Sequence, residues 1–316
     1  MISREGWGVA GAIAAPTILG SSVAVTKVLT DYPHYTGQTL RYGFAAIVLA
    51  IVLKARSMNF PRPDLRSLGL LVLVALTGLA GFNILMLLAL REAEPAAVGV
   101  VVGCVPIVLA TLGPLLSRQT PSRRVLTASV IVVAGAAIAQ GGGATTLKGF
   151  LLSLGILVCE AGFSLLAVPV LPKVGPHAIS LYVCIIATVI LGSAALIADG
   201  TGSFSRPSGS EAAAIAYLAV AVTCGAFIFW YEGISRLGVD RAGLFAGVIP
   251  MSALLSAVVI GEGSLGTYQV LGVLLVAAGV TFGVMGPSTA HKRAEEDMPS
   301  SAPNPELVPS EARQVS

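Results

Sequence analysis

Ten stretches of about 20 mainly apolar residues follow one another along the chain, and each is long enough to cross the hydrocarbon layer of a bilayer as a helix. Strands would leave backbone amides unpaired in lipid, and the ten-residue alternation of a membrane barrel is absent. The sequence therefore predicts an all-α integral membrane protein with ten transmembrane helices. The predicted spans are residues 7–28, 36–53, 67–90, 95–117, 125–144, 149–171, 177–198, 212–231, 242–261 and 266–286.

The charge content excludes a large water-soluble part. Only 11% of the residues are charged, against roughly 25% in ordinary globular chains. The net charge of +3 comes from scattered cations with no basic run carrying interleaved aromatics, so no nucleic-acid partner is expected. The expected partners are membrane lipid and a small-molecule solute. No metal site or cofactor is expected, because the four cysteines lack paired zinc spacings and the three histidines are far apart.

The distribution of Lys and Arg predicts the orientation. With the N-terminus inside, 14 of the 19 cations fall on the cytoplasmic side, so both termini are expected to be cytoplasmic. Residues 287–316 are rich in Ser, Pro, Ala and Glu, which predicts a disordered cytoplasmic tail. The cytoplasmic set is Arg4, Lys54, Arg56, Arg62, Arg66, Arg118, Arg123, Arg124, Lys173, Arg236, Arg241, Lys292, Arg293 and Arg313.

A weak internal repeat divides the chain into residues 1–144 and 145–286. Overall identity at an offset of 144 is low, but residues with special backbone roles coincide, which indicates duplication. Five helices in each half, an odd number, invert the second half relative to the first. The coinciding pairs are Gly81 and Gly225, Gly99 and Gly243, Gly103 and Gly247, Pro106 and Pro250, and Gly135 and Gly279.

Two of these features suggest helices that can move relative to one another. The small-xxx-small pairs Gly99/Gly103 and Gly243/Gly247 predict close helix packing. Pro106 and Pro250 each remove an amide donor near the middle of a span. Matched interrupted helices favour a substrate cavity between the halves, although a simple kink would also explain the prolines.

The residues also resemble a known family. The stretch "LGSSVAVTKVL" at residues 19–29, the stretch "LRYGFAAIVLAIVL" at 40–53, and "YEGISRLGVDRAGLFAGVIPMSALLSAVVIGEGSLGTYQVLGVLLVAAGV" at 231–280 are similar to the EamA-like family of the drug/metabolite transporter superfamily. The resemblance covers about residues 7–286. It implies a ten-helix inverted-repeat carrier of the cytoplasmic (inner) membrane, commonly an exporter of amino acids or related metabolites. One departure is Arg118 at the position matching Glu262, where members often carry an acid in both halves.

Glu160 is the carboxylate that the predicted spans place deepest, about 17 Å past Gly149 at ~1.5 Å per residue. Such a group could exchange a proton between the two sides or meet a substrate amine. The alternatives are a structural ion pair with Arg41 or Lys27, or a protonated Glu bonded to a hydroxyl. Arg41 itself could hold an anion or extend to the outer interface.

Other polar and aromatic residues are secondary candidates. Asn83, whose repeat mate is Phe227, is an amide in a charge-free helix and must find a partner, which makes it a cavity candidate. Ser164 can bond its own helix carbonyls and is a minor candidate. Trp230 and Tyr231 are expected in the aromatic belt at the cytoplasmic interface.

The function expected from these observations is a secondary transporter, an exporter by resemblance, that moves a small polar metabolite such as an amino acid, with proton coupling left open. A membrane-embedded enzyme lacks support, because neither HExxH nor GxSxG is present, and no enzyme activity is expected. A passive channel would not explain an inverted repeat with broken helices. The sequence does not rank substrates or fix the oligomeric state, and a homodimer is left open.

Overall fold

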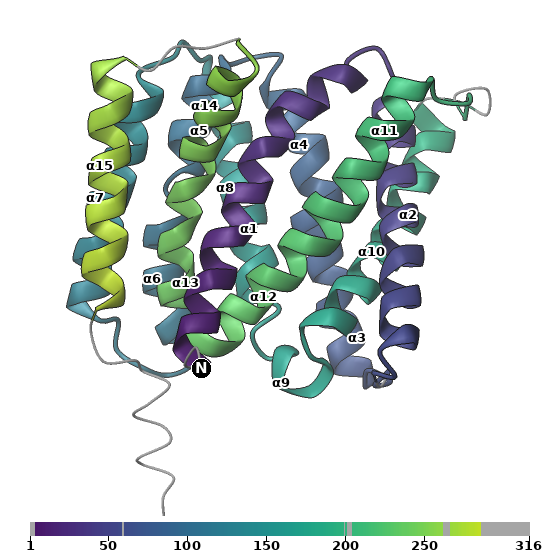
Figure 1. Ribbon diagram of the computed structural model, residues 1–316, viewed down its shortest axis with the longest axis horizontal. Helices are drawn as coiled ribbons and strands as arrows, with labels where there is room; N and C mark the ends of the chain where they lie inside the picture. The colour runs from purple at the N-terminus through teal and green to yellow at the C-terminus, as the bar shows by residue number, and fades with distance from the viewer. Residues whose placement is uncertain (1–3, 59, 199, 201–203, 262–265, 286–316) are drawn as a thin grey trace, which may run out of the picture. The chain divides into compact units, whose positions relative to one another are not determined.

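The computed structural model describes residues 4–58, 60–198, 200, 204–261 and 266–285; the predicted tail 287–316 and Glu262 lie outside them. The described residues form helices and no strand, apart from one isolated bridge between Ala93 and Thr145. The ten predicted spans are confirmed, because ten helices of the described part are long and apolar enough to cross a membrane (Figure 1).

Six of the spans are single helices. Their bounds are Arg4–Thr26 (α1), His34–Ala55 (α2), Arg123–Gln140 (α7), Leu147–Leu165 (α8), Pro176–Ala198 (α10) and Thr267–Val284 (α15). A short helix, α9 (Leu171–Val174), precedes α10.

The other four spans are composite. Two contain a π-helical stretch: α3 (Leu65–Ala75), Leu76–Gly81 and α4 (Phe82–Ala89), and α11 (Gly209–Tyr217), Leu218–Gly225 and α12 (Ala226–Leu237). Two are broken: α5 (Pro95–Val102) and α6 (Val105–Leu116), and α13 (Val239–Leu244), a 3-10 turn Phe245–Gly247 and α14 (Val248–Val259).

Local sequence explains where the helices begin and end. Asp64 caps α3, since its Oδ1 accepts the Ser67 amide at 2.9 Å, and Thr146 caps α8 through the Gly149 amide at 3.0 Å. Hydrogen bonding to Ser67 and the nearby Lys173 ammonium lower the pKa of the Asp64 carboxyl to about 2. Gly238, at φ 85°, ends α12 in a conformation that side chains with a Cβ avoid.

Element bounds recur at the same offset of 144 residues that the sequence predicts. Leu65, Pro95 and Arg123 begin helices, and so do Gly209, Val239 and Thr267, each 144 residues further on. Both π-helical stretches end at matched glycines, Gly81 and Gly225. The recurrence therefore extends from special residues to whole elements.

Helices α7 and α15, the last membrane spans of the two halves, pack against each other at one edge of the helical unit (Figure 1). A Cβ on Gly135 would lie 2.8 Å from the Gly272 carbonyl oxygen, and a Cβ on Gly279 would lie 3.1 Å from the Ala128 carbonyl oxygen. These contacts are reciprocal, because Gly279 follows Gly135, and Gly272 follows Ala128, by the same 144 residues. Since Ala128 faces Gly279 and Gly135 faces Gly272, the helices run antiparallel. Reciprocal antiparallel contacts are those expected of halves related by a two-fold axis across the helices.

Helix α2 packs along α10 at the opposite edge, through Gly43 against Thr188 and Gly192 against Thr39 (Figure 1). The largest core cluster includes residues of α2 and α10 and the fully buried Tyr231 of α12. Many other large apolar side chains are exposed, among them Ile47, Ile51, Val158 and Val189, as expected of a lipid-facing surface.

Candidate functional site

Two π-helical stretches at matched positions are the most unusual backbone feature. We call Leu76–Gly81 the first π-segment and Leu218–Gly225 the second π-segment. π-Helical turns are rare, and they occur frequently at functional sites because the extra residue leaves carbonyls displaced from the regular ladder. Their presence in both halves marks the middle of the helical unit as the candidate site.

Arg41 of α2 reaches the second π-segment. Its Nε donates to Thr223 Oγ1 at 2.9 Å, and its Nη1 lies 3.4 Å from Gln38 Oε1. Thr223 is fully buried, and its own hydroxyl donates to the Leu218 carbonyl at 2.9 Å, five residues earlier. Arg41 therefore points into the unit, so its predicted extension to the outer interface is not what the structure shows.

The neighbouring residue on α2 reaches the other π-segment. Tyr42 Oη accepts from Asn83 Nδ2 at 3.0 Å, and the same Nδ2 lies 2.6 Å from the Leu79 carbonyl. The expectation that Asn83 finds a partner is thus confirmed. We call Gln38, Arg41, Tyr42, Asn83 and Thr223 the polar bridge, because α2 links both π-segments through them.

Glu160 lies half-buried in α8, on the turn that packs against the first π-segment. A Cβ on Gly162 would lie 3.2 Å from Thr77, and a Cβ on Gly81 would lie 3.2 Å from Cys159 Sγ. No ion pair or hydrogen bond in the described part of the chain involves Glu160, so neither alternative to a functional role, an ion pair with Arg41 or Lys27 or a hydrogen bond to a hydroxyl, is formed there.

Four aromatic side chains, Phe163, Phe227, Trp230 and Tyr231, form an aromatic cluster beside Glu160. The Phe163 ring lies 5.0 Å from Phe227 and 5.2 Å from Tyr231, centroid to centroid. The Trp230 indole N–H donates to Ser164 Oγ at 3.1 Å. Placement of Trp230 and Tyr231 in an interfacial belt was wrong, because they are only 7% and 0% exposed.

The physical reason for that error is the end of the span, which lies at Leu237, six residues beyond the predicted end at Tyr231. α11, the second π-segment and α12 form one continuous span of 29 residues, Gly209–Leu237, so Trp230 and Tyr231 lie inside the span and not at its end. Tyr231 Oη is buried and makes no hydrogen bond in the described structure. A buried hydroxyl without a partner is rare and requires an explanation in function or in an alternative state.

The matched prolines mark where two spans break. Pro106 lies in the first turn of α6 and Pro250 in the first turn of α14. Because proline lacks an amide hydrogen, it cannot bond the carbonyl four residues back, which is Val102 at the end of α5 and Ala246 in the 3-10 turn. Each proline thus follows the break and starts the next segment.

The predicted packing glycines do touch neighbouring helices, with one exception. Gly243 faces Leu109 of α6, and Gly247 faces Val132 of α7. Gly99 faces the Gln140 side chain of α7. A Cβ on Gly103 would mainly meet the Gly99 carbonyl, at 2.9 Å, so Gly103 serves the local turn at the break.

Sequence reasoning selected Glu160, Arg41 and Asn83 but missed Tyr42, Gln38, Thr223 and Phe163. Tyr42, Thr223 and Phe163 are ordinary residues for a membrane span, so only their contacts identify them, whereas Gln38 is an amide like Asn83 and could have been selected for the same reason. One available signal was the repeat pair Gly81 and Gly225, which ends the two π-segments.

A shallow cleft of about 530 Å3 lies elsewhere, between Leu90–Pro95 and Ala144–Thr146 at the ends of spans. The Lys148–Glu92 ion pair, at 2.8 Å, joins the first turn of α8 to the first of these connections. None of the predicted site residues lines this cleft.

Comparison with known proteins agrees with the fold and the transport class. The chain is similar to two proteins of Bacillus subtilis (strain 168): the "Uncharacterized transporter YetK", 28% identical over 79% of this chain and 78% of the relative, and the "Uncharacterized transporter YdeK", 26% identical over 82% and 89%. A crystal structure that is 18% identical aligns with a TM-score of 0.76 over 89% of this chain and 98% of that one, which supports the fold. The model of the EamA-like transporter family matches residues 6–140 and again 147–285. The chain belongs to the EamA-like transporter family.

Proposed function

We propose that the protein is a secondary transporter that moves a small polar metabolite, such as an amino acid, across the cytoplasmic membrane by alternating access. The observation that carries this proposal is the pair of matched π-segments, joined by polar side chains of α2. Family membership and transporter-named relatives support a membrane transporter over an enzyme. Export is the direction proposed, on the family resemblance.

The proposed mechanism uses the two halves, residues 1–144 and 145–286, as inverted copies. The reciprocal contacts of α7 and α15 support this relation. Inverted copies can exchange conformations, so that a path between them opens first to one side and then to the other. The broken spans at Pro106 and Pro250 and the π-segments provide irregular backbone at which helices can bend.

Glu160 is proposed to carry a proton during this cycle. It is half-buried within a membrane span and has no ion-pair partner in the described structure. An ionisable side chain held in a span costs roughly 3 kcal/mol at the helix centre by insertion scales, which is tolerated most readily where it serves function.

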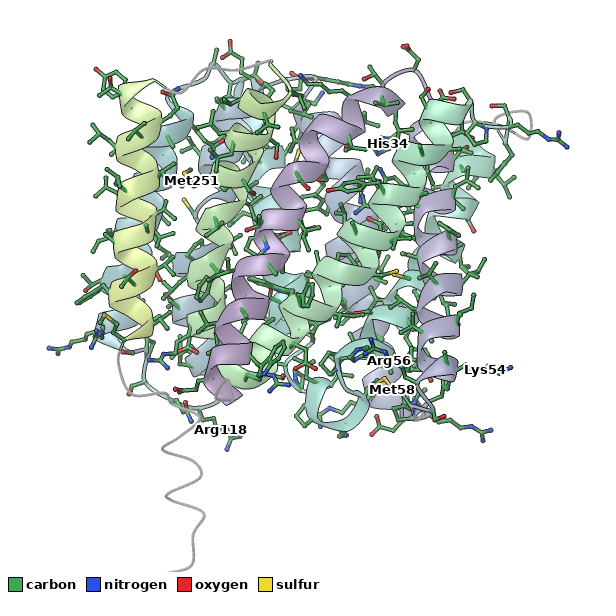
Figure 2. All side chains as sticks on the ribbon, in the orientation of Figure 1. His34, Lys54, Arg56, Met58, Arg118 and Met251 are labelled. Carbon is green, nitrogen blue, oxygen red and sulfur yellow. The ribbon has the colours of Figure 1, made fainter. Side chains whose placement is uncertain are left out.

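The proposed orientation has both termini in the cytoplasm. Lys54, Arg56 and Arg118 gather at the end of the helical unit at which α1 begins, and His34 lies near the opposite end (Figures 1 and 2). Clustering of cations at one end supports the positive-inside assignment.

Counterflow in proteoliposomes tests the transport class. Vesicles preloaded with an unlabelled amino acid should transiently accumulate the same labelled amino acid when the protein is a carrier. A channel would equilibrate the label without overshoot and would overturn the carrier proposal. The measurement uses each of the twenty common amino acids in turn.

Glu160→Gln tests proton coupling, since the amide keeps the side-chain shape. The variant should retain counterflow and lose accumulation driven by a pH difference. Glu92→Gln is the matched control, because Glu92 lies at a span end in the ion pair with Lys148. Loss of folded protein would favour a structural role for Glu160, and loss of all solute binding would favour direct contact. Accumulation by Glu160→Gln under a pH difference alone would refute coupling at this residue.

A further inference from the structure

Arg41 is a charged side chain inside a membrane span without a charged partner. It is the eighth residue of α2, about 10 Å along the helix from His34 at ~1.5 Å per residue. It is half-buried, and none of the ion pairs in the described part of the chain includes it. Its contacts are a threonine hydroxyl, a glutamine oxygen and the Tyr42 ring, 5.1 Å from the guanidinium carbon.

These neutral contacts leave the guanidinium charge uncompensated. Hydrogen bonds to hydroxyl and amide oxygens orient the group, but an anion would stabilise it far more in this setting. A carboxylate binds guanidinium side-on through two parallel N–H groups, and the favoured edges use Nε with one terminal nitrogen or both terminal nitrogens. In this structure Nε already donates a hydrogen bond to Thr223 Oγ1, at 2.9 Å.

Thr223 is tied in turn to the second π-segment. A threonine hydroxyl has a single hydrogen, and the one on Thr223 is given to the Leu218 carbonyl at 2.9 Å. Its lone pair accepts from Arg41. The Arg41–Thr223 hydrogen bond therefore links a charged group of the first half directly to the irregular backbone of the second half.

We propose that Arg41 binds a carboxylate of the transported solute and that this binding exchanges the Arg41–Thr223 hydrogen bond for hydrogen bonds to the solute. The inference rests on the proposed transport function and adds a specificity residue and a coupling step to it. Release of Thr223 removes one of the hydrogen bonds between α2 and the second π-segment, while the Cys224 thiol still donates to the Ala45 carbonyl of α2 at 3.4 Å, so arrival of the anion is connected to a local backbone change in the other half. A lipid phosphate has similar chemistry, and the test separates it from a solute.

The test starts from binding to the purified full chain in neutral detergent. Thermal unfolding with each common amino acid and with straight-chain monocarboxylates identifies the carboxylate that stabilises the protein most. Dissociation constants are then measured for this carboxylate and for its carboxamide, which has nearly the same shape without the charge. Wild-type protein should prefer the carboxylate by about 10-fold or more, as expected for a charge-assisted bidentate pair.

Two variants give opposite results when the inference is correct. Arg41→Gln should bind carboxylate and carboxamide about equally. Thr223→Val should bind the carboxylate about 3- to 10-fold more tightly, because the competing internal hydrogen bond is gone. Such a gain is not expected of a residue that only supports the fold. Arg41→Lys, which keeps the charge but not the planar fork, should keep a reduced preference and serves if Arg41→Gln fails to fold. Arg91→Gln is the control for charge removal, since Arg91 is exposed.

Several results would overturn the inference. These are an unchanged carboxylate preference in Arg41→Gln, weaker carboxylate binding in Thr223→Val, or no stabilisation of the wild type by any carboxylate of the set. Arg41-dependent stabilisation by phosphatidylglycerol alone would assign the guanidinium to lipid and would also overturn it. If the inference fails but the wild type shows counterflow of an uncharged or cationic solute, the transport proposal still stands. Absence of all counterflow would count against transport itself.

Discussion

Replacing Gly135 with Ala should destabilise the protein although alanine is the better helix former. The added Cβ would lie 2.8 Å from the Gly272 carbonyl oxygen, 2.9 Å from Leu275 Cβ and 2.9 Å from the Val276 amide nitrogen. Two of these obstacles are backbone atoms, so α7 and α15 must separate. Overpacking costs typically about 1–3 kcal/mol, against a gain of ~1 kcal/mol in helix propensity. The expected net loss is therefore up to about 2 kcal/mol.

Gly69→Ala is the matched control. Gly69 lies in α3, where an added Cβ meets nothing within 4 Å. Only the propensity gain remains, so this variant should be more stable by up to ~1 kcal/mol. Gly279→Ala should fall between them, because its closest obstacle is the Val132 side chain at 2.8 Å, with the Ala128 carbonyl at 3.1 Å.

The free energy of unfolding is measured by titrating mixed micelles with sodium dodecyl sulfate and following the fluorescence change. The reasoning predicts the stability order Gly69→Ala, wild type, Gly279→Ala, Gly135→Ala. Equal effects of Gly135→Ala and Gly69→Ala would refute close backbone packing of α7 on α15.

Three further predictions address other parts of the structure. Ser164→Ala should lower the free energy of unfolding by about 1–3 kcal/mol, because the buried Trp230 N–H loses its acceptor; Ser193→Ala, at an exposed helix position, should change it little. Asp64→Ala should lower the melting temperature at pH 7, and the difference should shrink as pH falls from about 4 towards about 2, because the folded-state pKa of Asp64 is lowered and its capping is lost on protonation; an undiminished difference at pH 2 would contradict this. In a variant without native cysteines, Arg62→Cys should react with an impermeant thiol reagent only in inverted vesicles and Lys148→Cys only in right-side-out vesicles, and the reverse pattern would overturn the proposed orientation.

The sequence predicted the fold because membrane helices are set by length and hydropathy. Each of the ten spans satisfies that single requirement alone, without knowledge of its neighbours. The 144-residue offset was also detectable, because Gly81, Gly225 and the matched prolines have backbone roles that other residues fill poorly.

The site was predictable only in part. Glu160 and Arg41 stand out because charge in a span is costly wherever it lies. Thr223 and Tyr42 do not stand out, since their importance comes from contacts with residues far away in the sequence. Thr223 binds Arg41, 182 residues away, and Tyr42 binds Asn83, 41 residues away. Nor did hydropathy reveal the π-segments, or the end of the 29-residue span Gly209–Leu237, inside which Trp230 and Tyr231 are buried.

The packing of α7 on α15 also has a consequence for biosynthesis. Thr267 follows Arg123 by 144 residues, so α7 waits on the order of 10 s for its partner at ordinary rates of protein synthesis. Mean hydropathy is 1.3 in α7 but 2.5 in α10, so α7 partitions into lipid with a smaller driving force. Until α15 has been synthesised, the face of α7 that carries Gly135 lacks the helix against which it packs. The packing of α7, the last span of the first half, is therefore completed only when α15, which is made much later, enters the membrane.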